Sequence, residues 1–124
     1  MGRPILATVL LLSLSLTSCG GNAPKAERLT EQERAGERLF IQNCAACHAT
    51  IPETIIVGPS LAGIAVSAEG KVPGQDARSY MESSILEPSE YINDGFNDLM
   101  PKTFGKTLTG EELDSLLAYL FTLK

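Results

Sequence analysis

Two cysteines and the only histidine of the chain fall within five consecutive residues, Cys44-Ala45-Ala46-Cys47-His48. Cys-X-X-Cys-His is the attachment sequence of c-type haem. Each thiol can form a thioether bond to one haem vinyl group, and the adjacent imidazole can then bind the iron. The motif therefore predicts one covalently bound haem c, with Cys44 and Cys47 as attachment points and His48 as an axial iron ligand.

The same three side chains allow other kinds of site. A thioredoxin-like redox dithiol belongs in a βαβ context, and no alternating strand pattern surrounds this motif. A zinc site needs four ligands, and the chain offers no second Cys/His pair. A disulfide between Cys44 and Cys47 would close a very short loop, would add little stability and would leave His48 without a role. Haem attachment accounts for all three residues.

The second axial position of the iron requires another ligand, and the composition narrows the choice. His48 is the only histidine, so methionines are the remaining soft donors. Met1 belongs to a leader segment that would be removed, and Met81 lies in a predicted helix, where a core-filling role accounts for it. Met100 lies in an aperiodic segment and precedes Pro101. We therefore expect Met100 to bind the iron.

The first 18 residues have the features of a secretory signal. Arg3 precedes an almost wholly apolar stretch over residues 5–16, and this combination is typical of a signal peptide. The stretch ends in the sequence Leu-Thr-Ser-Cys at residues 16–19, which resembles the bacterial lipobox. We expect residues 1–18 to be a lipoprotein signal peptide. An ordinary signal peptide followed by an incidental cysteine is the alternative.

Cys19 would then be the first residue of the mature chain and would carry the lipid. Two or more acyl chains hold a protein stably to a bilayer, whereas one chain does so only marginally. Residues 19–28 are small, polar and aperiodic, which predicts a flexible tether. The pattern indicates a protein on the periplasmic side of a membrane, anchored there by lipid.

The composition limits the number of domains and the class of partner. The chain has 124 residues, of which 44% are hydrophobic and 20% charged, and this length suits one globular domain. Its net charge of −5 leaves no basic surface large enough to follow a phosphate backbone, so a nucleic-acid partner is not expected. The expected domain runs over residues 29–124.

Three segments of helical periodicity are expected to position the motif. Thr30 and Glu33 form a capping-box pattern, and Thr109 begins a second one. Asp76 is a suitable N-cap for a helix that ends before Pro88. The predicted helices cover residues 31–47, 77–86 and 110–124, with a short helical turn over 61–66 and loops over 49–60 and 87–107. The expected fold is all-α, with three principal helices plus loops wrapped around one haem.

These features together resemble a class I monohaem cytochrome c over nearly all of residues 31–124. Residues 36–40 are similar to the first helix of that family, in which a glycine lets the last helix cross closely. Residues 116–120 are similar to that last helix, and the resemblance implies that Tyr119 lies across Gly36 and Phe40.

The same resemblance implies how the haem is held. Gly58-Pro59-Ser60-Leu61 is similar to the family's loop in which the proline carbonyl accepts a hydrogen bond from the proximal histidine. Leu99-Met100-Pro101 resembles the family's distal loop. The haem-contacting residues that follow from the sequence are Phe40, Pro59, Leu61 and Tyr119, and the expected apolar lining is Phe40, Leu61, Ile64, Ile85, Leu99 and Phe104.

The resemblance implies one-electron transfer between redox partners of a respiratory or photosynthetic electron-transport chain. It does not imply that this polypeptide catalyses a reaction by itself. The pattern over residues 85–109 also resembles cytochrome c domains of membrane respiratory complexes, whose lipoprotein members include a subunit of alternative complex III. The lysine ring of mitochondrial-type members is missing, because only Lys102 and Lys106 flank Met100. A haem peroxidase or a small-ligand-binding protein is the alternative, and it would need an open iron coordination site.

Overall fold

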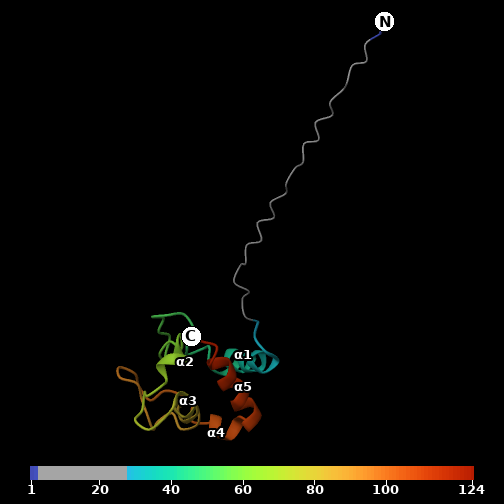
Figure 1. The fold of residues 1–124 in the computed structure, drawn as a ribbon. Coiled ribbons are helices and arrows are strands. Elements are labelled where there is room, and N and C mark those ends of the chain that lie inside the picture. Colours follow the sequence, from blue (N-terminus) through green and yellow to red (C-terminus); the bar gives the residue numbers. More distant parts are fainter. Residues whose placement is uncertain (3–27) are drawn as a thin grey trace.

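The computed structural model describes residues 1–2 and 28–124. This part of the chain contains five helices and no β-strand. Most of the predicted signal peptide and tether, with Cys19, lies outside the described residues. The expectation of an all-α fold is confirmed. The helices, shown in Figure 1, are α1 (Glu31–Asn43), α2 (Ile64–Ser67), α3 (Ala77–Leu86), α4 (Phe104–Thr107) and α5 (Gly110–Leu120).

Three predicted N-caps are confirmed by their hydrogen bonds. The Thr30 hydroxyl accepts from the Glu33 amide, and the Glu33 carboxylate accepts from the Thr30 amide. The same reciprocal pair joins Thr109 and Glu112 at the start of α5. The Asp76 carboxylate accepts from the Ser79 amide at the start of α3. Each cap satisfies free amides of the first helical turn, so these three helix starts follow from local sequence.

The end of α1 differs from the expectation, because the helix stops at Asn43 instead of continuing to Cys47. The carbonyl of Phe40 accepts from the amides of both Cys44 and Ala45, and this sharing closes the last turn. The amides of Cys47 and His48 then bond back to the carbonyl of Cys44. The Cys-X-X-Cys-His motif is therefore folded as a series of tight turns at the C-terminal end of α1.

The two capping-box helices, α1 and α5, pack against each other (Figure 1). A Cβ atom on Gly36 would overlap the carbonyl oxygen of Ser115 and lie 2.8 Å from Cβ of Tyr119. The ring centroids of Phe40 and Tyr119 are 5.4 Å apart. The expectation that Tyr119 lies across Gly36 and Phe40 is confirmed, and Gly36 is what allows the close approach.

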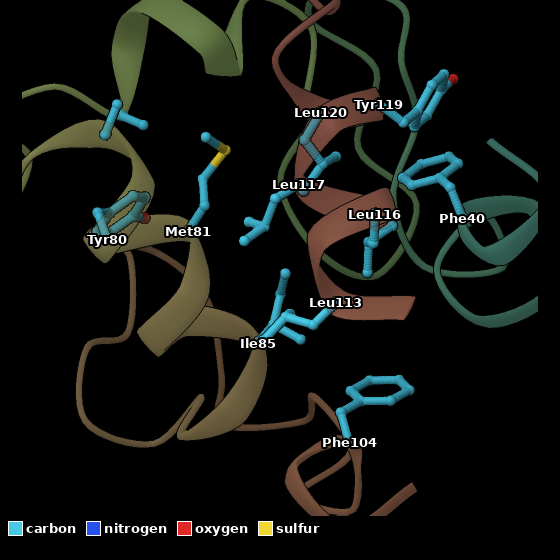
Figure 2. Packing of buried hydrophobic residues seen from close by; sticks show 12 residues of the cluster. Phe40, Tyr80, Met81, Ile85, Phe104, Leu113, Leu116, Leu117, Tyr119 and Leu120 are labelled. Atoms are coloured by element: carbon cyan, nitrogen blue, oxygen red, sulfur yellow. The ribbon is translucent and has the colours of Figure 1, made fainter. Parts of the chain in front are cut away.

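The core lies between α3 and α5. Figure 2 shows Met81 and Ile85 extending from α3 toward Leu117 and its neighbours on α5. Leu117 is fully buried and Met81 nearly so. Residues 104–107, expected to belong to a loop, form the single turn α4, which places the buried ring of Phe104 against this core.

Gly36→Ala should destabilise the protein, because the added methyl group meets backbone of α5 that cannot move aside. The overpacking cost of about 1–3 kcal/mol exceeds the gain of about 1 kcal/mol from replacing glycine inside a helix. Denaturant unfolding of the haem-loaded protein measures the difference. Gly105→Ala is the matched control, since a Cβ there has its closest contact at 3.5 Å; equal stability of the two variants would contradict this account of the crossing.

Candidate cofactor site

A cavity opens between α1, α3, α5 and the two long loops that connect them. Its lining includes the three motif residues, Cys44, Cys47 and His48, together with Met81 and Met100. The empty space, counted with its open mouth to solvent, is about 1210 Å³. The motif therefore lies in the wall of a largely apolar cavity.

The imidazole of His48 is held by a loop that follows it in the chain. Its Nδ1 lies 2.8 Å from the carbonyl oxygen of Pro59. A carbonyl can only accept, so Nδ1 carries the proton and Nε2 keeps its lone pair for a metal. The amides of Val57 and Gly58 bond to the carbonyl of Cys47, which keeps this loop against the motif.

Gly58 provides the space in which the His48 ring lies. A Cβ atom on Gly58 would be 2.5 Å from Cε1 and 3.0 Å from both ring nitrogens of His48. Any larger residue would push the ring away or open the loop. The backbone around the imidazole is thus shaped for a ring in one orientation, and it fits an axial ligand of haem iron.

The two thiols are half-buried and not bonded to each other. The pKa of the Cys44 thiol is raised to about 11, mainly by burial and to a lesser extent by the neighbouring Cys47. Its sulfur is therefore uncharged at neutral pH. In a thioether bond to haem the sulfur is likewise uncharged. Residues 28–124 also contain no group of three or more His, Cys, Asp and Glu side chains placed to share a metal ion. The site fits haem attachment.

Both candidate methionines reach the cavity. Met100 is half-buried and lies in the loop between α3 and α4, residues 87–103, as the sequence predicts. Met81 belongs to the buried core, in agreement with a packing role, but it also lines the cavity. Position in the fold separates the two, because Met81 is fixed within a helix and Met100 is carried by a loop.

The loop that carries Met100 is attached to α3 by a contact that the sequence did not indicate. The Asn93 side-chain amide donates to the hydroxyl of Tyr80 at 3.2 Å, and the ring of Tyr91 meets that of Tyr80 edge-on, with centroids 5.8 Å apart. Tyr80, Tyr91 and Asn93 all line the cavity. The sequence indicated only that Tyr80 and Ser84 share one face of the helix predicted over residues 77–86.

A hydrogen bond and an ion pair also connect the two ends of the same loop. The carboxylate of Asp98 accepts from the Ser89 hydroxyl at 3.0 Å and pairs with the Lys102 ammonium at 3.0 Å. Lys102 and then Ser89 lower the pKa of Asp98, so this carboxylate stays ionised at neutral pH. These bonds connect the segment before Met100 to the segment after it.

The remaining predicted haem-contacting residues divide into two groups. Pro59, Leu61 and Phe40 line the cavity, as do the other four residues of the expected apolar lining, Ile64, Ile85, Leu99 and Phe104. Tyr119 is not among the described residues that line it. Leu116 and Leu120 are the α5 residues that line the cavity, whereas Tyr119 packs on Phe40. The assignment of Tyr119 as a haem contact stays a prediction.

A model of the family described as cytochrome c oxidase, cbb3-type, subunit III matches residues 31–120. The fold and the site define a monohaem class I cytochrome c, a protein that transfers electrons through covalently attached haem c. The chain belongs to the family of that model. A comparison with curated proteins finds no significant match. Within the described residues, no helix is long and apolar enough to cross a membrane.

Gly58→Ala should disturb the site at His48, because the new methyl group overlaps the imidazole ring. We expect the free energy of unfolding of the haem-loaded protein to fall by about 1–3 kcal/mol and the NMR resonances of the His48 ring to shift. Gly110→Ala is the control, since a Cβ there meets nothing within 4 Å and should change stability by less than about 0.5 kcal/mol. Unchanged His48 resonances in Gly58→Ala would show that the ring does not depend on this space.

Proposed function

We propose that this protein is a lipid-anchored monohaem cytochrome c that transfers single electrons between redox partners of a respiratory or photosynthetic chain, on the periplasmic side of a membrane. The observation that carries the proposal is a single cavity lined by the Cys-X-X-Cys-His motif and Met100, with the His48 ring oriented by Pro59. The partners are membrane-bound redox proteins or subunits of one complex, and no nucleic acid is involved.

In this proposal Cys44 and Cys47 would hold the haem covalently, and His48 Nε2 and the Met100 sulfur would bind its iron. When bound, haem c supplies a one-electron ferric/ferrous couple. The Pro59 carbonyl raises the basicity of the imidazole and fixes its orientation. A thioether ligand raises the reduction potential relative to a second histidine. The apolar lining excludes water and favours the less charged ferrous state.

The chemistry of the lining favours electron transfer over catalysis. Among the described residues of the cavity wall, His48 supplies the one imidazole and Asp98 the one carboxylate. His48 is bonded to Pro59, and Asp98 is held by Ser89 and Lys102. A peroxidase requires an open iron position and a group that assists O–O cleavage, whereas the proposed Met100 ligand closes that position. The site suits an electron carrier whose haem iron would keep the same two protein ligands.

The family description supports a place in a membrane oxidoreductase complex. It names subunit III of cbb3-type cytochrome c oxidases, and the pattern of residues 85–109 resembles cytochrome domains of respiratory complexes such as alternative complex III. A lipid on Cys19 would keep the haem domain at the membrane surface. We propose that this protein is such a subunit, tethered by lipid.

Met100→Ala tests the distal ligand. Loss of the soft, neutral thioether should lower the reduction potential and remove the near-infrared sulfur-to-iron absorption band. The opened site should then bind carbon monoxide. Met81→Leu is the matched control: it conserves volume, should cost less than about 1.5 kcal/mol of stability and should keep the band. Loss of the band in Met81→Leu with its retention in Met100→Ala would reverse the assignment.

Cys19→Ser tests the anchor. Removing the acceptor thiol should release the haem-containing protein into the soluble fraction or leave it with an uncleaved signal peptide. Membrane fractionation with haem staining measures the distribution, and mass spectrometry of the wild-type N-terminus measures the lipid. Ser18→Ala retains the thiol and serves as the control. A mature wild-type chain that begins elsewhere than Cys19, or carries it unmodified, would disprove the anchor.

A further inference from the structure

The loop that carries Met100 makes few hydrogen bonds to the rest of the protein. In the described chain, every backbone hydrogen bond made by residues 88–102 stays within residues 87–103. The serine–aspartate bond and the ion pair of this loop also lie within it. The bond from the Asn93 side-chain amide to the Tyr80 hydroxyl is the one that reaches a residue outside. A single hydrogen bond therefore attaches the middle of this loop to a helix.

That bond lies where the loop meets the interior of the protein. Over residues 91–100 only Asn93, Phe96 and Met100 are half-buried, and the others are exposed. A hydrogen bond shielded from water is electrostatically stronger than one in water, whereas the serine–aspartate bond of the same loop is exposed. Asn93 is thus the polar point at which this stretch, with its methionine, is held against the core.

The acceptor of this bond has a fixed position. Tyr80 lies on α3 with 5% of its surface exposed, and the ring of Tyr91 meets its ring edge-on. Figure 2 shows the Tyr80 ring on the side of α3 that faces away from Leu117. Side chains in a close-packed interior have little freedom to change position, so the hydroxyl is held ready to accept from Asn93.

We propose that Tyr80 is a positioning residue for the distal iron ligand: by holding Asn93, its hydroxyl keeps the loop closed and the Met100 sulfur at the iron. The inference rests on the proposed function, in which Met100 binds the iron. Opening of the loop withdraws the sulfur and frees the position for an external ligand. Such a ligand binds only the open fraction, so its apparent affinity is proportional to that fraction. The Tyr80 bond thereby sets how often the position is free.

Imidazole binding to the ferric, haem-loaded full chain in non-ionic detergent tests this role, and spectrophotometric titration measures the apparent affinity. Tyr80→Phe keeps the ring and removes the acceptor. It should raise the apparent affinity about threefold to tenfold, which corresponds to the loss of one hydrogen bond of ordinary net strength. Asn93→Ala should raise the affinity to a similar extent. The double variant should bind no more tightly than the tighter single variant, because both changes remove the same bond.

Thr122→Val is the matched control for a general loss of stability. The Thr122 hydroxyl also makes a part-buried hydrogen bond, to the carbonyl of Tyr119 at 2.7 Å. It lies outside the loop and is not among the described residues that line the cavity. Its loss should lower the free energy of unfolding, as Tyr80→Phe does. The apparent imidazole affinity should stay within about twofold of wild type, because distant sites do not couple.

The outcomes separate this inference from the proposed function. A wild-type protein that lacks the near-infrared sulfur-to-iron band contradicts the proposed Met100 ligand itself. A wild type with the band, and unchanged imidazole affinity in Tyr80→Phe and Asn93→Ala, overturns the positioning role alone. An equal gain in Thr122→Val, or a double variant whose gain is the product of the two single gains, also overturns it. If Tyr80→Phe does not retain haem, the comparison of Asn93→Ala with Thr122→Val decides.

Discussion

The close crossing of α1 and α5 is the constraint on which the rest of the structure depends. It exists because Gly36 leaves room for the backbone at Ser115. α1 ends at Asn43, and the Cys-X-X-Cys-His motif is folded in the turns that follow that end. The crossing also turns Leu116 and Leu120 of α5 into the cavity. A single missing side chain therefore sets the position of the covalent attachment point relative to one wall of its pocket.

The loops complete the site by different means. The loop after the motif is held by backbone hydrogen bonds, and its Pro59 carbonyl orients His48 by accepting from the side-chain Nδ1. The loop that carries Met100 has no regular structure, and side chains hold it: Asn93 to Tyr80 on α3, and Ser89 to Asp98 within the loop. The proposed proximal ligand is thus oriented by a backbone carbonyl, whereas the segment with the proposed distal ligand depends on a few side-chain contacts. Loops so held open at lower free energy than packed helices do.

Exposed ion pairs lie both on helices, as in Arg34 with Glu31, and in the loop that carries Met100, where Lys102 pairs with Asp98. Such exposed pairs contribute little stability. Among the described residues that line the cavity, Asp98 is the single Asp, Glu, Lys or Arg, and Lys102 pairs with it.

The sequence by itself determined what depends on neighbouring residues. The Cys-X-X-Cys-His motif, the caps at Thr30, Asp76 and Thr109, and the all-α class are local patterns, and each was predicted. The tertiary structure decided what depends on distant residues. It brought Met81 as well as Met100 to the cavity. It also paired Tyr80 with Asn93. Periodicity indicates which face of a helix is apolar, but only the packing of the helices decides which apolar residues meet one another and which surround a cofactor.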